Sequence, residues 1–135
     1  MIHRCGLAVA RGYERALQPI EMSPVETGVL MAVAYSGPNH VRGLARLLGV
    51  GRQTIVNTTK RLQAVGLLAA SSNENDARLL QFSITRLGRR KLVQVEQIAS
   101  HFDQQLRELV GQQNEADMVQ KLQHIAEAPF LAYED

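Results

Sequence analysis

The sequence predicts a mainly helical fold that carries one small β-hairpin. Apolar residues recur at three- and four-residue steps along most of the 135 residues, and two short runs near the middle resemble strands. Glycine or proline separates these segments, as expected at the ends of helices and in turns. The length suits a single domain. We therefore expect one α+β domain over residues 1–135.

Two helices are predicted at the start of the chain. Residues 2–17 form an apolar stripe with helical spacing, and Pro19 closes this helix. Ser23 can cap a second helix, with a proline at its first position and Glu26 placed to complete a capping box. This second helix is expected to stop at Gly37, which a proline follows.

The next segment predicts two short helices joined by a tight turn. The first begins near residue 39 or 40, and Gly49 ends it in the left-handed position that follows many helices. Ala45 is small, which lets the second helix, residues 52–65, cross close to the first. The inner face of that second helix is expected to consist of Ile55, Thr58 or Thr59, Leu62 and Val65.

A hairpin and two further helices complete the chain. Residues 67–71 and 79–84 read as strands with a polar tip between them, and Thr85 can cap the helix that follows. That helix is long and extends to Gly111, with a heptad-like apolar seam suited to packing against another helix. The seam consists of Leu92, Val95, Ala99, Phe102, Leu106 and Leu109. A last helix is expected near residues 114–127.

Helix, turn, helix and hairpin in this order constitute a winged helix-turn-helix, here centred on residues 40–91. The predicted DNA-contacting residues of its second helix are Arg52, Gln53, Thr54, Val56, Asn57, Lys60 and Arg61. Amide side chains such as Gln53 and Asn57 can read adenine edges in a major groove, and Val56 suits a thymine methyl group. Thr54, Lys60 and Arg61 suit phosphate contacts.

The charge distribution also indicates a polyanionic partner. Residues 40–91 contain ten basic and two acidic side chains, a net charge of +8, whereas the rest of the chain carries −6. A basic middle between acidic flanks is the electrostatic pattern of a nucleic-acid-binding segment.

These residues together resemble the MarR family of regulators. The resemblance rests on "GLARLLGVGRQTIVNTTKRLQAVGLL", on "DARLLQFSITRLGRRKL" and on the long apolar helix that follows. The hairpin pattern of an acidic residue, an arginine and a strand ending in Ile-Thr-x-x-Gly falls on Asp76, Arg78, Ile84, Thr85 and Gly88. The resemblance covers most of the chain.

The resemblance implies an obligate homodimer that binds double-stranded DNA as a transcription regulator, with residues 23–88 as its DNA-binding part. It implies that Arg78 reaches a minor groove from the wing while Asp76 orients its guanidinium group. It further implies a repressor acting on pseudo-palindromic operators and released by a small aromatic or phenolic effector. Residues 1–20 and 89–128 would form the dimer.

The apolar surface of the terminal helices supports a dimer independently, because it exceeds what one small winged domain can cover. The predicted dimerisation residues are Val9, Tyr13, Leu92, Val95, Phe102, Leu106, Leu109, Leu122 and Ile125.

Two alternative functions remain open. Cys5 lies in the first helix, where one branch of the resembled family senses organic peroxides, so a thiol-based sensor is one alternative. A winged helix that binds protein is the second, although the polar and basic face around Gln53, Asn57 and Lys60 argues against it.

The sequence does not support an enzyme, a metal-binding protein or a membrane protein. The chain has no glycine-rich phosphate loop, nucleophile elbow or paired acidic site, so we expect no enzyme and no cofactor. Its four histidines are scattered without metal-ligand spacing, so no metal is expected. No signal peptide or membrane segment is predicted, and the single cysteine suits a reducing cytoplasm.

Overall fold

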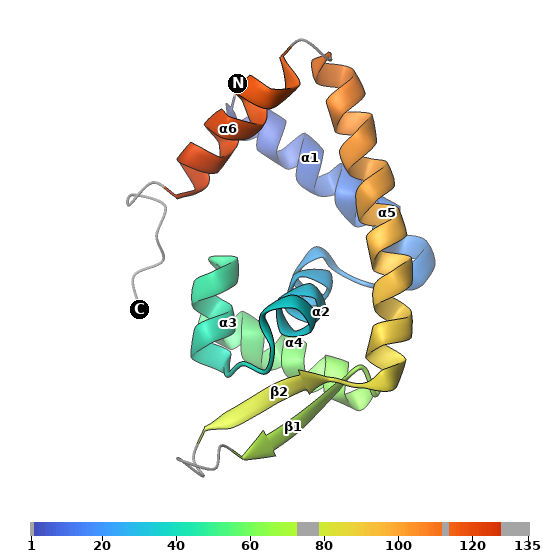
Figure 1. Ribbon diagram of the computed structural model, residues 1–135, viewed down its shortest axis with the longest axis vertical. Helices are drawn as coiled ribbons and strands as arrows, with labels where there is room; N and C mark the ends of the chain where they lie inside the picture. The colour runs from blue at the N-terminus through green and yellow to red at the C-terminus, as the bar shows by residue number, and fades with distance from the viewer. Residues whose placement is uncertain (1, 73–78, 112–113, 128–135) are drawn as a thin grey trace.

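The computed structural model describes residues 2–72, 79–111 and 114–127. Its elements, in chain order, are α1 (Ile2–Leu17), the short 3-10 turn η1 (Gln18–Ile20), α2 (Pro24–Ser36), α3 (Val41–Leu48), α4 (Arg52–Ala64), β1 (Leu68–Ser72), β2 (Leu80–Ile84), α5 (Arg86–Val110) and α6 (Glu115–Ala126). Figure 1 shows a lower body made of α2, α3, α4 and the hairpin, and an upper frame made of α1, α6 and the far half of α5. The long helix α5 connects the two. The fold is thus mainly helical with one hairpin, as predicted.

The link from α1 to α2 is a turn followed by a well-capped helix start. α1 ends at Leu17 as predicted, but Pro19 lies inside η1, which carries the chain around to α2. The Ser23 hydroxyl oxygen accepts a hydrogen bond from the Glu26 backbone N–H, and the Glu26 carboxylate accepts one from the Ser23 N–H, each at 3.2 Å. The predicted capping box is therefore present.

The turn between α3 and α4 fixes the position of the helix-turn-helix. Gly49 adopts the left-handed conformation, with φ of 64°, and its N–H donates to the carbonyl oxygen of Ala45. This confirms the role predicted for Gly49, because a side chain is strained in that region of backbone space. Leu44 and Ile55 are completely buried where the two helices meet.

The wing is an antiparallel hairpin in which Leu68 pairs with Ile84 at the base. The strands begin one residue later than predicted at positions 67 and 79. Asn39, just before α3, forms a bridge with Phe82 in which each residue donates its N–H to the other's carbonyl oxygen, at 3.1 and 2.7 Å. The hairpin is thereby joined to the helix-turn-helix body.

Thr85 and Gly88 fasten the start of α5 to the end of α4. The Thr85 hydroxyl oxygen accepts from the Gly88 N–H at 2.9 Å, which confirms the predicted cap. The same hydroxyl donates to the carbonyl oxygen of Gly66 at 2.6 Å. Gly88 is buried, and a Cβ atom there would collide with the Leu67 carbonyl oxygen, so only glycine fits.

The apolar seam of α5 is used largely within the chain. Leu92 and Val95 are buried in the core of the winged-helix body, so their prediction as dimerisation residues is wrong. Further along, Phe102 packs against Tyr13 of α1, whereas Leu109 is 84% exposed. The first part of the seam therefore packs in the body, its middle packs against α1, and only its C-terminal end faces solvent.

One residue of the predicted inner face of α4 is misplaced. Ile55, Thr58, Thr59 and Leu62 are buried, but Val65 is 53% exposed. α4 ends at Ala64, and the backbone leaves the helical conformation at Val65, so the helical spacing no longer applies there.

Candidate nucleic-acid interface

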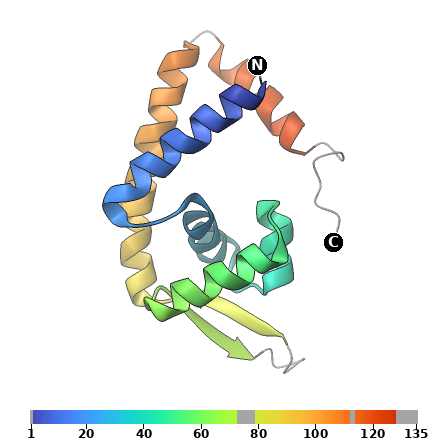
Figure 2. The ribbon, with the colours of Figure 1, turned by 180° about the vertical axis from the view of Figure 1, so that it is seen from behind.

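Helix α4 lies on the surface of the body just above the hairpin, where Figure 2 shows it in green on the near side. Its inward residues Ile55 and Leu62 are buried, which fixes the rotation of the helix about its axis. Of the predicted DNA-contacting residues on α4, Arg52, Gln53, Thr54, Asn57, Lys60 and Arg61 are exposed and Val56 is half-buried. A polar and basic face is thus presented outward.

Gln53 and Asn57 form a connected pair on this face. The Gln53 side-chain amide N–H donates to the Asn57 side-chain oxygen at 3.0 Å, one helical turn away. This bond leaves the Asn57 amide hydrogens and one further lone pair on its oxygen for an outside partner. An amide presented in this way matches the donor and acceptor pattern of an adenine edge.

The polar residues on the inner side of α4 are satisfied within the helix. The Thr58 hydroxyl donates to the Thr54 carbonyl oxygen at 2.7 Å, and the Thr59 hydroxyl donates to that of Ile55 at 2.9 Å. Neither hydroxyl therefore needs a partner from outside the helix. The polar groups of α4 that can reach an outside partner therefore lie on its outer face.

Arg61 has a protein partner that the sequence analysis did not anticipate. Its Nε lies 2.9 Å from Oε1 of Glu26, whose side chain is only 8% exposed, whereas the Arg61 side chain is 62% exposed. The other carboxylate oxygen of Glu26 accepts from the Ser23 N–H in the capping box. The ion pair joins the last turn of α4 to the first turn of α2. The phosphate contact proposed for Arg61 stays a prediction.

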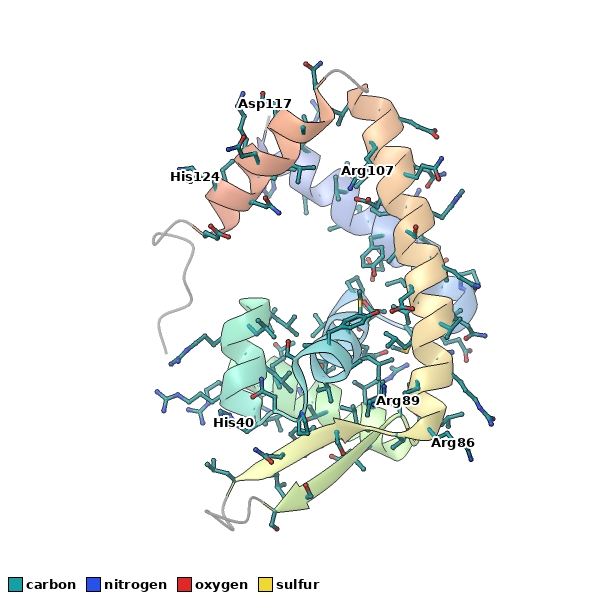
Figure 3. The ribbon with its side chains drawn as sticks, in the orientation of Figure 1. His40, Arg86, Arg89, Arg107, Asp117 and His124 are labelled. Carbon is teal, nitrogen blue, oxygen red and sulfur yellow. The ribbon has the colours of Figure 1, made fainter. Side chains whose placement is uncertain are left out.

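A second basic group lies at the start of α5. Arg86, Arg89 and Arg90 are exposed and Lys91 is half-buried, and the first turn of the helix contains no acidic residue. Cations near a helix N-terminus oppose the helix macrodipole, so they do not serve the stability of α5. Figure 3 labels Arg86 and Arg89 where α5 leaves the hairpin. From the sequence, these residues were predicted only to add to the positive charge of the segment.

The tip of the wing lies outside the described residues. Asp76 and Arg78 belong to that segment, so their roles stay predictions.

The remaining predicted dimerisation residues lie on the frame. Tyr13 and Phe102 contact each other within the chain, and Leu106 is half-buried. Val9, Leu109, Leu122 and Ile125 are exposed by 41, 84, 58 and 48%. Three further exposed apolar residues of the same frame were not predicted from the sequence: Leu7, Met118 and Val119.

Other features of the described part of the chain are plain. Cys5 lies exposed on α1. Within residues 2–72, 79–111 and 114–127, no group of three histidine, cysteine or acidic side chains could hold a metal ion. No helix in the same residues is long and apolar enough to cross a membrane.

Residues 20–79 match the sequence model of the MarR family. Among proteins with curated descriptions, no sequence match was found. The fold resembles that of BpsR from Bordetella bronchiseptica, with a TM-score of 0.87 and 18% sequence identity over 94% of this chain and 91% of BpsR. The BpsR structure is described in connection with the regulation of its DNA binding by 6-hydroxynicotinic acid.

Two further structures are similar. The repressor CouR bound to a 23-mer DNA duplex has a TM-score of 0.86 at 24% identity, over 93% of this chain and 89% of CouR. A cysteine-to-serine variant of MarR from E. coli, complexed with operator DNA, has a TM-score of 0.82 at 20% identity, over 94 and 91% of the two chains. The winged-helix segment, residues 20–79, thus matches the MarR family in sequence, and the fold that contains it is shared with these three proteins along nearly the whole chain.

Proposed function

We propose that the protein is a repressor that binds pseudo-palindromic operators as a homodimer in the cytoplasm, and not an enzyme. The observation that carries the proposal is the outer face of α4, where the connected pair Gln53 and Asn57 lies beside the exposed Lys60. Amide groups for base edges and a cation for phosphate are the two kinds of contact that specific recognition requires. We assign DNA binding to residues 23–88.

Exposed apolar side chains on the frame support the homodimer. Met118, Leu122 and Ile125 share one face of α6 and are exposed by 40, 58 and 48%, while Leu109 at the end of α5 is 84% exposed. A group of large apolar residues on one part of a small protein marks an interface. We assign this apolar surface to contact with a second copy of the chain. Two-fold symmetry would then place the two α4 helices about 34–36 Å apart, which is one turn of DNA.

Release by a small aromatic molecule is the regulatory part of the proposal. BpsR, similar in fold, is described with a ligand that regulates its DNA binding. The sign of regulation proposed here is repression relieved by the ligand, as the family resemblance implies.

Selection from a random duplex library with the full chain tests the proposal. We expect enrichment of an inverted repeat, bound by two protomers with an affinity that falls as salt rises. Leu122→Glu should shift the protein from dimer to monomer in sedimentation and weaken operator binding, whereas Gln120→Glu, an exposed polar position on the same helix, should do neither. A monomeric wild type, or no enriched duplex, contradicts the proposal.

A further inference from the structure

A patch of three arginines lies at the start of α5, beyond the outer face of α4. The α5 patch consists of Arg86, Arg89 and Arg90, whose spacing of three and four residues places them on one face of the helix. All three are exposed. The buried residues of α5 lie on its other side and are Gly88, Leu92 and Val95. The patch is therefore turned to the solvent and takes no part in the core.

The cations of the α5 patch are not neutralised within the described part of the chain. In residues 2–72, 79–111 and 114–127, no carboxylate forms an ion pair with any of the three arginines. The first turn of α5 contains no acidic residue, and Glu96, the first carboxylate of the helix, lies two turns beyond Arg89. Like charges one turn apart repel each other, and cations at this end oppose the helix macrodipole. The patch therefore costs the helix stability, and its charge is available to an anion outside the chain.

The α5 patch adjoins the basic end of α4. The Thr85 hydroxyl, which caps α5, donates to the carbonyl oxygen of Gly66 just after α4, at 2.6 Å. Arg61, in the last turn of α4, and Arg90 line the same surface hollow. Lys60 is exposed next to Arg61. The cations at the end of α4 and those of the patch are thus neighbours on the surface.

The α5 patch is separate from the predicted wing contact. Leu68 and Ile84 pair at the base of the hairpin, beside the start of α5, and the strands run from there to Ser72 and Leu80. Figure 1 shows α5 beginning at this base end. The outer face of α4 therefore has the hairpin along it and the patch at its C-terminal end.

We propose that the α5 patch binds backbone phosphates of the same duplex that α4 enters, at the edge of the major groove. The proposal rests on the proposed function, because it adds a second phosphate-binding surface to the outer face of α4. A phosphate backbone borders the major groove on each side, so a basic surface at the end of a helix in the groove meets one of them. Guanidinium groups suit this partner because their paired N–H donors match two phosphate oxygens. Such contacts position α4 and carry no sequence information.

The salt dependence of duplex binding tests the patch. The full chain and the double variant R86Q/R89Q are titrated, by fluorescence anisotropy, into a duplex with the enriched inverted repeat and into a scrambled duplex. We expect the slope of log affinity against log salt to fall by about two units per protomer, and low-salt affinity to fall about tenfold on both duplexes. R11Q/R15Q removes the same charge from exposed positions of α1 and should bind as the wild type does.

Uncharged phosphates locate the contact. Methylphosphonate groups, placed one at a time along the duplex, should weaken binding of the wild type wherever a cation meets a phosphate. R86Q/R89Q should be insensitive at about two of these positions in each half-site and remain sensitive at the others. R86K/R89K keeps both charges and should retain the salt slope of the wild type.

Stability separates a surface contact from a role in folding. The thermal midpoint of R86Q/R89Q should equal that of the wild type or exceed it, because repulsion at the start of α5 is relieved. A variant that unfolds well below the wild type contradicts the proposal, since the arginines would then act within the fold. An unchanged salt slope, an equal loss in R11Q/R15Q, or a loss confined to the enriched sequence overturns it too.

The same titrations distinguish this inference from the proposed function. A wild type that binds the enriched duplex, with R86Q/R89Q binding it at the same slope, refutes only the patch. A wild type that binds neither duplex refutes the proposed function, and the patch with it.

Discussion

The rings of Tyr13 and Phe102 lie with their centroids 5.4 Å apart and hold α1 against the middle of α5. The Tyr13 hydroxyl also lies 3.4 Å from the Thr27 hydroxyl of α2, so a single side chain contacts both the frame and the body. Gly12 lies against the Phe102 ring, which lets the two helices approach closely. The aromatic contact is thus one of the contacts that attach α1 to α5.

Phe102→Ala should lower the free energy of unfolding by about 3 kcal/mol. This value lies at the low end of the losses seen when a core phenylalanine is replaced by alanine, because Phe102 is only half-buried. Urea denaturation measures the change. Gln105→Ala, an exposed position of the same helix, should alter stability by less than about 0.5 kcal/mol. Equal effects of the two substitutions would show that the aromatic contact is not formed in solution.

Arg61→Ala should destabilise the protein by about 1–2 kcal/mol. It leaves the Glu26 carboxylate nearly buried with only the capping-box hydrogen bond, and the exposure of Arg61 keeps the loss below that of a fully buried pair. Lys60→Ala, one residue earlier and exposed, is the control and should change stability little. Thermal and urea unfolding of the two variants, compared side by side, check this.

Asn57→Ala should weaken binding to the selected operator by about 1–3 kcal/mol and leave binding to random duplexes nearly unchanged. The reason is the amide edge that Asn57 presents beside Gln53. Because the two amides are hydrogen-bonded, the binding free energy lost in the double variant with Gln53→Ala should be smaller than the sum of the losses in the two single variants. A uniform loss on all sequences would assign Asn57 to phosphate contact.

Lys60→Ala should reduce the slope of log affinity against log salt by about one unit per protomer on any duplex, because one phosphate contact is lost. Fluorescence anisotropy over a series of salt concentrations gives the slope. Lys121→Ala, on α6 and paired with Asp117, should leave it unaltered. An unchanged slope for Lys60→Ala would remove this residue from the interface.

Gly88→Ala should cost about 1–3 kcal/mol of stability, because the added methyl group meets the Leu67 carbonyl oxygen and the Ile84 side chain. Gly6→Ala is the control: nothing lies within 4 Å of a Cβ there, and alanine favours the helix. Unfolding curves should therefore shift in opposite directions for the two variants.

Local patterns predicted the helices and the hairpin well, because caps and breakers act over a few residues. Ser23, Gly49 and Thr85 each serve the predicted role at a helix end. The apolar seam of α5 was harder to interpret, because periodicity shows that a face is buried and not which surface buries it. Leu92 and Val95 are covered by the chain's own core.

The parts of the site that sequence reasoning missed depend on long-range contacts. Glu26 was predicted only as part of a capping box, and Arg61 only as a phosphate contact. The two residues lie 35 positions apart in the sequence, and only the packing of α4 on α2 brings them together. The outer face of α4 was predictable because one helix supplies all of it.

The bridge between Asn39 and Phe82 has a mechanical consequence. It fastens the inner strand of the wing to the residue that precedes α3, so the wing cannot swing independently of the helix-turn-helix. In the proposed complex, where α4 and the wing enter neighbouring grooves, the distance between these two contacts is therefore fixed within each protomer. We expect operators whose groove widths depart from this span to be discriminated by the energy of bending the duplex, even where no side chain touches a base.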